Sequence, residues 1–230
     1  MSVPVFKKIG LLAATDSEIS LVRETAGLVR AAQTGTFPVF FLGEFLGREI
    51  VLAKSGIGKV NSALACLELI KKYSPDCIIN TGAAGAVAED LSLGTPVAGS
   101  LSVYHDVWCG IPNSYGQVQG LPARFASDRR LLGATLSCGI RCGLICSGDM
   151  FITEKKEIAA VRDRFPEALA VDMESCSIAQ TCFLYKVPFL PVRFISDTAD
   201  SGLRQEEYDN FWKEISLYSF SFIRDLLGKI

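Results

Sequence analysis

The chain has 230 residues, a formal net charge of −2 at pH 7, 49% hydrophobic residues and 21% charged residues. A nearly neutral chain has no long-range attraction for nucleic acids or anionic lipids, and no apolar run is long enough to span a membrane. The length suits one large domain covering residues 1–230, with ample hydrophobic core. The expected partner is therefore a small molecule or a protein surface.

Apolar runs and helical patterns alternate along the chain, which is typical of an α/β fold with substantial parallel strand pairing. In chain order we expect a strand at 8–14, a helix at 15–28, two or three strands within 37–56 and a helix between Gly58 and Pro75. A buried strand should begin at Cys77 and end in a small-residue turn at 80–85. Further strands are expected at 143–148, 168–171 and 187–196 with helices between them, and an amphipathic helix over the last twenty residues. The helix after Gly58 places Val60, Ala63, Leu64, Leu67 and Ile70 at helical spacing.

The eight cysteines are read as buried free thiols rather than a disulfide framework. No two of them form a CxxC pair, and the chain has a single histidine, His105, so a zinc site is not expected. The first ten residues lack the apolar core and cleavage site of a signal peptide. A cytoplasmic location is the resulting expectation.

Polar residues gather where the predicted strands end, which is where ligands bind in open α/β sheets. Six such strand exits carry glycines, acids or an arginine: residues 15–18, "SGIGK" (55–59), "NTGAAG" (80–85), "SGDMF" (147–151), "DMES" (172–175) and "RFISDTAD" (193–200). If these exits meet at one edge of the sheet, they form one ligand site.

Several of these motifs also have purely structural interpretations. "SGIGK" fails the phosphate-loop pattern, because Val60 stands where serine or threonine is needed, and it is either a tight turn or a close approach of backbone to ligand. Thr15 and Glu18 have the spacing of a capping box. Arg193 suits an ordinary ion pair, and His105 a hydrogen-bonded structural role. Asp197 and Asp200 suit loop caps.

Asp172 and Glu174 are two carboxylates at the junction of a strand and a helix. Residues two apart on a strand share a face, so both should point the same way while Met173 points to the other side. Crowded carboxylates are costly unless a cation, a hydrogen-bond donor or a ligand meets them. The sequence alone does not say which.

Taken together, the motifs resemble one family over nearly the whole chain, the 5′-methylthioadenosine/S-adenosylhomocysteine nucleosidases of the nucleoside phosphorylase superfamily. Seven ordered blocks carry the resemblance: "IGLLAATDSEISLVRE", "SGIGKVNSALA", "INTGAAG", "YHDV…YGQ", "SGDMFI", "AVDMESCSIAQ" and "VPFLPVRFISDTAD". The resemblance implies a central, mixed, twisted sheet surrounded by helices, no cofactor and no metal, and a homodimer whose pocket is completed across the interface.

The resemblance also implies roles for individual residues. Glu174 would accept hydrogen bonds from the ribose 2′- and 3′-hydroxyls, and Met173 would pack on the sugar, which leaves Asp172 as a supporting or surface carboxylate. Asp197 would be the general acid at N7 of adenine, and Glu18 the base that activates water. Arg193, near Glu18, would be a substrate-binding residue. The remaining contacts would come from Phe151, stacked on adenine, from the backbone of Ile152 at its Watson–Crick edge, from Ala84 and Gly85 in the base pocket, and from Ile57 in the 5′-substituent pocket.

Three departures from the family pattern affect the sugar and 5′-pockets. Ala83 replaces a serine near the sugar and water, and Thr15 replaces a methionine near the ribose. The "WCGIPNSYGQ" segment is one residue shorter than usual and lacks a phenylalanine lent by the partner subunit, for which Tyr208 or Trp212 could compensate. The catalytic set is intact, so the 5′-substituent preference is the property left open.

The predicted reaction is hydrolysis of 5′-methylthioadenosine, S-adenosylhomocysteine or 5′-deoxyadenosine to adenine and the 5-substituted ribose. The enzymatic alternatives are an aminodeoxyfutalosine-type nucleosidase and a purine nucleoside phosphorylase. A phosphorylase needs an arginine cluster for phosphate, which Arg193 alone does not supply. The non-enzymatic alternative is a nucleoside-binding protein, which would need neither the acid nor the base.

Overall fold

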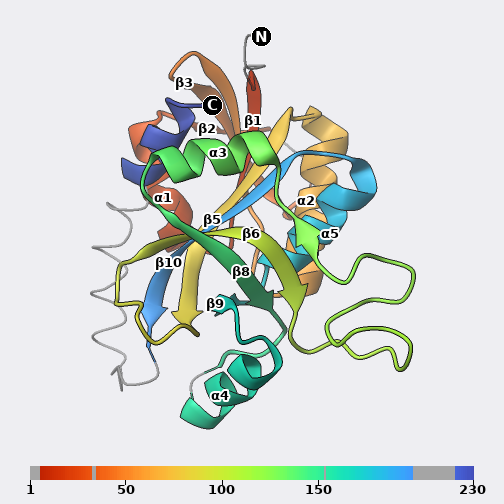
Figure 1. Cartoon of the computed structure of the whole chain (residues 1–230). Coiled ribbons are helices and arrows are strands. Elements are labelled where there is room, and N and C mark those ends of the chain that lie inside the picture. The colour runs from red at the N-terminus through yellow and green to blue at the C-terminus, as the bar shows by residue number, and fades with distance from the viewer. Residues whose placement is uncertain (1–5, 33–34, 153, 199–220) are drawn as a thin grey trace.

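The protein is built on one ten-stranded mixed sheet with helices around it (Figure 1). The computed structural model describes residues 6–32, 35–152, 154–198 and 221–230. Its strands are β1 (Lys8–Ala13), β2 (Val29–Arg30), β3 (Val39–Phe45), β4 (Arg48–Lys54), β5 (Cys77–Ala86), β6 (Pro96–Tyr104), β7 (Phe125–Ala126), β8 (Arg141–Ser147), β9 (Ala168–Asp172) and β10 (Phe189–Asp197). The path through the sheet is β10-β6-β8-β9-β5-β1-β4-β3-β2, with β7 beside β6. The predicted fold class is confirmed.

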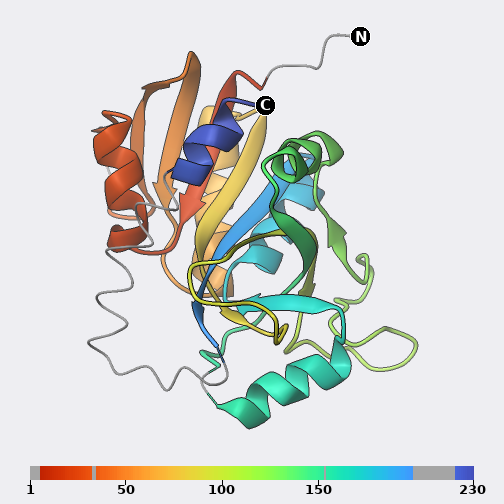
Figure 2. The ribbon, with the colours of Figure 1, turned by 60° about the vertical axis from the view of Figure 1, so that its left-hand side comes forward.

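β5 is the strand on which the sheet closes. Its first part pairs in parallel with β1 and with β10, and its last residues, Gly85 and Ala86, pair with β9. Because β10 also pairs with β6, the strands β5, β10, β6, β8 and β9 form a closed ring, visible from the side in Figure 2. The ring brings the ends of β9 and β10 to the same stretch of β5.

The helices are α1 (Asp16–Thr25), α2 (Lys59–Tyr73), α3 (Arg129–Ser137), α4 (Lys155–Arg164) and α5 (Ser175–Tyr185), and residues 221–227 are also helical. α2 and α5 lie together on one side of the sheet, and α1 and the 221–227 helix lie on the other (Figure 1). Each side has its own core. Ile19 and Leu226 pack in the first cluster and Leu69 and Ile178 in the second.

The small-residue segment at 80–85 is strand, not the turn expected from its glycines. β5 continues through it to Ala86. Small residues are needed there because other side chains press against the strand: a Cβ on Gly82 would lie 2.7 Å from both Arg193 Nη1 and Glu18 Oε1, and one on Gly85 would lie 2.8 Å from Asp197 Oδ2. The glycines therefore admit functional side chains instead of turning the chain.

The apolar residues at helical spacing in α2 are only partly its buried face. The helix buries Ser62, Ala65, Cys66, Leu69 and Ile70, whereas Val60 is 68% and Leu64 48% exposed. Small residues face inward because α2 packs closely on α5, where Ser62 and Ser177 share a 2.7 Å hydrogen bond between their hydroxyls. The larger apolar residues are left on the outer face.

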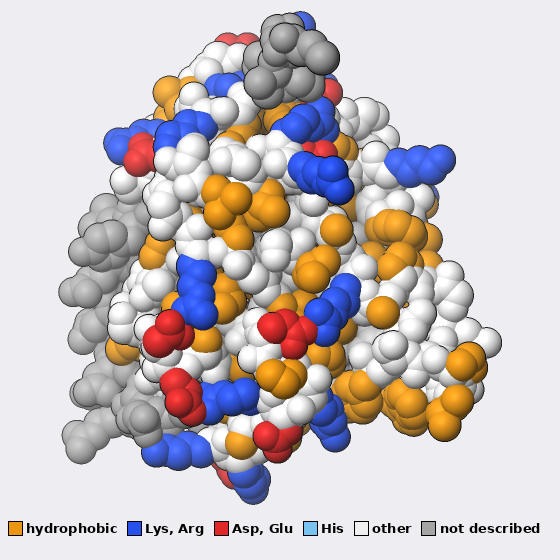
Figure 3. All heavy atoms as spheres, viewed as in Figure 1, with side chains coloured by type: hydrophobic (Ala, Val, Ile, Leu, Met, Phe, Trp, Pro, Cys, Tyr) orange, Lys and Arg blue, Asp and Glu red, His pale blue; other side chains and the backbone are white. Residues whose placement is uncertain are grey.

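All eight cysteines are free, and five of them are buried, as the sequence predicts. Within the described ranges, no helix is both long and apolar enough to cross a membrane. Figure 3 shows hydrophobic side chains gathered toward the right-hand edge of the molecule, the side on which α5 and the loop after β6 lie. Exposed members of this side include Trp108, Ile111, Phe183, Leu184 and Tyr185.

Candidate active site

One pocket lies at the strand ends that the sequence singled out. Its wall is formed by Ala14, Thr15, Glu18, Ile57, Ala83, Ala84, Gly85, Met150, Phe151, Ile152, Val171, Asp172, Met173, Glu174, Ser196 and Asp197. Every predicted site residue except Arg193 is in this set. The strand exits therefore converge as expected, even though they come from segments up to about 180 residues apart.

Glu18 has two roles at the start of α1. Its Oε2 accepts hydrogen bonds from the amides of Ala14 (2.7 Å) and Thr15 (3.0 Å), and Thr15 Oγ1 accepts one from the Glu18 amide, which confirms the capping box. Its Oε1 accepts a 3.2 Å hydrogen bond from the amide of Ala83 on β5. The cap and the β5 contact fix the carboxylate at the pocket wall, so the two interpretations of Glu18 are compatible.

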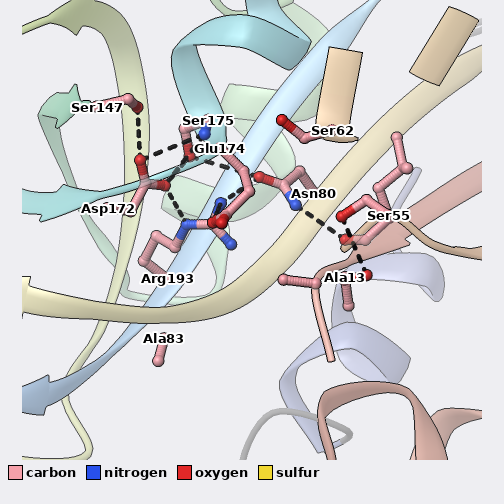
Figure 4. Close-up of polar contacts among 12 residues, drawn as sticks. Ala13, Ser55, Ser62, Asn80, Ala83, Ser147, Asp172, Glu174, Ser175 and Arg193 are labelled. Atoms are coloured by element: carbon pink, nitrogen blue, oxygen red, sulfur yellow. Dashed lines mark hydrogen bonds and ion pairs between the residues drawn. The ribbon is translucent and has the colours of Figure 1, made fainter. Parts of the chain in front are cut away.

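Arg193 lies behind the pocket, not in its wall. Its side chain is 1% exposed, and its Nε donates a 2.5 Å hydrogen bond to Asp172 Oδ2. Its Nη2 donates to Asn80 Oδ1 and lies 3.8 Å from Glu174 Oε2 (Figure 4). The ion-pair interpretation of Arg193 is confirmed, and its predicted contact with substrate stays a prediction.

Asp172 is a buried structural carboxylate, so the surface alternative is wrong. Ser147 Oγ donates to its Oδ1 at 2.5 Å, the amide of Ser175 donates to both oxygens at 3.3 Å, and Ser175 Oγ donates to Oδ2. With Arg193, these donors surround the carboxylate, as Figure 4 shows. Asp172 and Glu174 thus face the same guanidinium, and Arg193 is the cation that compensates their negative charge.

Glu174 lies at the N-terminus of α5, and its negative charge is farther from Arg193 than that of Asp172. Its Oε1 accepts a 3.0 Å hydrogen bond from the amide of Gly58, and Arg193 is its more distant partner. Burial and the neighbouring charge of Asp172 raise the pKa of Glu174 to about 7, against the opposing effects of Arg193 and Gly58. β9 ends at Asp172, so strand alternation stops there and Met173 also lines the pocket.

Asp197 ends β10 in the pocket wall. Ser196 Oγ donates a 2.5 Å hydrogen bond to its Oδ1, and its Oδ2 faces Gly85. Burial raises the pKa of Asp197, although the Ser196 hydroxyl opposes the shift. A carboxyl with a raised pKa keeps its proton to higher pH, which suits a general acid.

Several residues that shape the site lie in the predicted strand exits, but sequence reasoning assigned them no individual role. They are Asn80, Ser147, Ser175, Ser196 and the amide of Gly58. Their position next to glycines and acids was the available signal. His105 is buried outside the pocket wall, and its Nε2 has no hydrogen-bond partner among the described residues. Asp200, Tyr208 and Trp212 lie outside the described residues.

Comparison with known proteins gives the relationship. The model of the phosphorylase superfamily matches residues 8–227. The 5′-methylthioadenosine/S-adenosylhomocysteine nucleosidase of Aeromonas salmonicida is 37% identical over 97% of this chain and 100% of its own length. The chain belongs to this nucleosidase family.

Solved structures of related proteins agree in fold. The nucleosidase of Neisseria meningitidis in complex with methylthio-immucillin-A superposes with a TM-score of 0.90 at 34% identity, covering 97% of this chain and 100% of that one. The futalosine hydrolase of Helicobacter pylori reaches a TM-score of 0.89 at 27% identity, covering 98% and 99%. The fold is therefore shared by enzymes with different nucleoside substrates.

Asp172→Asn should destabilise the protein, contrary to the small effect that a supporting or surface role implies. An amide leaves the buried Arg193 charge with only Glu174 at 3.8 Å, and breaking a buried pair typically costs about 3–5 kcal/mol. The free energy of unfolding should be measured by urea denaturation, with Asp90→Asn, in an exposed pair with Arg141, as the matched control. Equal stability of the two variants would contradict the role assigned to Asp172.

Proposed function

We propose that the protein hydrolyses the N-glycosidic bond of adenine nucleosides with 5′-thio substituents, 5′-methylthioadenosine and S-adenosylhomocysteine. The observation that carries the proposal is the pair of carboxyls, Glu18 and Asp197, that line one pocket. Both carboxyls line the pocket, Glu18 against Gly82 and Asp197 against Gly85 of the same strand. An acid and a base in one pocket are what hydrolysis of a glycosidic bond requires.

The proposed mechanism assigns each proton. Asp197 gives its proton to N7, so the adenine leaves as a neutral base while the sugar gains oxocarbenium character. Glu18, fixed by the amides of Ala14, Thr15 and Ala83, orients a water and takes its proton as the oxygen bonds to C1′. Two carboxyls in different surroundings thus serve as acid and base.

Glu174 is proposed to hold the ribose diol. Two hydroxyl donors would favour its ionised form, which burial and Asp172 disfavour when the site is empty. Substrate therefore supplies the compensation that the protein leaves incomplete. Met173 would pack on the sugar. Arg193 is proposed to bind substrate from behind the pocket wall, beside Glu174.

The base and 5′-group are proposed to occupy the less polar parts of the pocket. Ala84, Gly85, Phe151 and Ile152 would contact adenine, and Ile57 the 5′-substituent.

The structural likeness to a futalosine hydrolase keeps an aminodeoxyfutalosine-type nucleoside as the second candidate substrate. The names of the relatives favour the 5′-thio nucleosides.

Hydrolysis rather than phosphorolysis is supported by the charges of the pocket. No arginine or lysine is among the described residues that line it. The guanidinium of Arg193 is occupied by Asp172, Asn80 and Glu174. Among the described residues, a phosphate dianion would therefore meet carboxylates without a compensating cation.

A homodimer is proposed on the apolar outer face. Val60 and Leu64 on α2, with Phe183, Leu184 and Tyr185 on α5, are exposed together with Trp108 and Ile111. This face adjoins the pocket, because Ile57 in the pocket wall lies just before α2.

We further propose that residues 1–230 form one domain. From the eight free thiols, we propose that the protein is cytoplasmic.

The product assay tests the proposed function. Incubation with 5′-methylthioadenosine should release free adenine and free 5-methylthioribose at a rate that does not change when phosphate is added. Chromatography of the sugar product decides the reaction type. Formation of a ribose 1-phosphate would make the protein a phosphorylase, and no adenine release from any 5′-substituted adenosine would reject the proposal.

Asp197→Asn should lower kcat by about 10²–10⁴-fold, because an amide cannot supply the proton to N7. The raised pKa of Asp197 gives a sign to the pH profile: wild-type activity should fall as pH rises through that pKa, where the acid loses its proton. The variant should lack this decline. Activity within a few-fold of wild type would exclude Asp197 as the acid.

Leu64→Glu should convert the dimer to a monomer, since it places a charge on the proposed interface. Molar mass from light scattering after gel filtration is the measurement. Leu136→Glu on α3 is the control, because Leu136 is similarly exposed on another side of the molecule. A wild-type monomer would reject the homodimer outright.

A further inference from the structure

Three charged side chains meet beside the pocket without lining it. Lys59 begins α2, Asp106 follows β6, and Asp149 follows β8. Lys59 Nζ donates to Asp106 Oδ2 at 2.7 Å and lies 3.8 Å from Asp149 Oδ2, and the Asp149 amide donates to Asp106 Oδ2 at 2.9 Å. These three residues, the Lys59 clamp, connect the N-terminus of α2 with the segments that follow β6 and β8. The proposed mechanism gives none of the three a role.

The clamp is connected to the sugar side of the pocket through two successive amides. The amide of Gly58 donates to Glu174 Oε1, and the next amide, that of Lys59, donates to Asp149 Oδ1 at 2.7 Å. Gly58 has φ 91°, and a Cβ there would lie 2.9 Å from Asp149 Oδ1. The N-terminus of α2 therefore holds the sugar-side carboxylate with one amide and the clamp with the next.

The clamp is connected to the base side through the chain itself. Asp149 is followed by Met150, Phe151 and Ile152, all in the pocket wall. Phe151 is 61% and Met150 47% exposed, so their own packing does little to fix them, whereas Ile152 is buried in the hydrophobic core. The position of Met150 and Phe151 therefore depends on how Asp149 is anchored.

The anchoring differs from an ordinary surface ion pair. Lys59 and Asp106 are about three-quarters buried, and Asp106 accepts from both an ammonium and an amide. Burial opposes the ionised form of Asp106, but these two hydrogen bonds hold its pKa below the usual value. Behind the loop, a Cβ on Gly148 would lie 2.4 Å from His105 Nε2, so the loop is packed tightly against the histidine.

We propose that Lys59 and Asp106 are positioning residues of the nucleosidase, which hold the 149–151 segment so that Phe151 meets the purine base. The proposal rests on the base-binding role given above to Phe151. Lys59 touches neither base nor sugar and acts through Asp149 and Asp106. Its loss should therefore weaken binding of the base while leaving the acid, the water and the diol contacts in place.

Lys59→Met is the test, because it removes the ammonium but keeps the apolar stem and the backbone amide. We expect the Kd for adenine, measured by calorimetry, and the KM for 5′-methylthioadenosine to rise roughly tenfold, as expected for loss of one charge-assisted contact. kcat should stay within about threefold. Lys59→Arg should restore most of the affinity. Lys156→Met, which removes the lysine of an exposed pair with Glu154 at the start of α4, is the matched control and should change neither constant.

A double variant separates positioning from general stability. In Lys59→Met, the further change Asp106→Asn should raise KM little, because the two side chains share one contact, whereas independent roles would give additive losses. Unchanged adenine affinity in Lys59→Met, or a fall in kcat at constant KM, would overturn the proposal. If Lys59→Met does not fold, Asp106→Asn alone decides by the same adenine titration. Wild type that neither binds nor releases adenine would instead reject the proposed function.

Discussion

The charge of Arg193 is the constraint on which the rest of the site depends. A guanidinium that is 1% exposed must be compensated inside the protein, and Asp172 does this at 2.5 Å with help from Asn80. Glu174 is then a second carboxylate facing one cation, so its ionisation is only partly compensated. The fold thereby gives Asp172 a close ion pair and leaves Glu174 only partly compensated, which is the basis of the diol-binding role proposed for Glu174.

β5 positions the other two carboxyls of the pocket, those of Glu18 and Asp197. The strand contacts β1, β10 and β9 in turn, and each neighbour ends in a site residue or leads into one. Gly82 and Gly85 have no side chains, so Glu18, Arg193 and Asp197 can press against the backbone. The composition of "NTGAAG" thus serves close approach, which is the other physical reason for glycine besides a turn.

The N-terminus of α2 links Glu174 to the loop that begins at Asp149. Its first amides bind the carboxylates of Glu174 and Asp149, in keeping with the affinity of helix N-termini for negative charge. The turn interpretation of "SGIGK" is confirmed by the positive φ of Gly56 and Gly58. The amides of Gly58 and Lys59 bind carboxylates of the protein, and close approach of this backbone to a neutral ligand stays a prediction.

The sequence by itself determined the alternating fold, the strand ends that form the pocket, the capping box of Glu18 and the free thiols, because periodicity, caps and composition are local properties. Only the tertiary structure decided that Asp172 is buried, that Arg193 stands behind the pocket and that Lys59 reaches Asp106 and Asp149. It also decided which face of α2 is buried, since small residues at Ser62 and Cys66 suit contact with α5. These outcomes depend on which residues distant in the chain come to lie opposite each other, and neither spacing nor residue type records that.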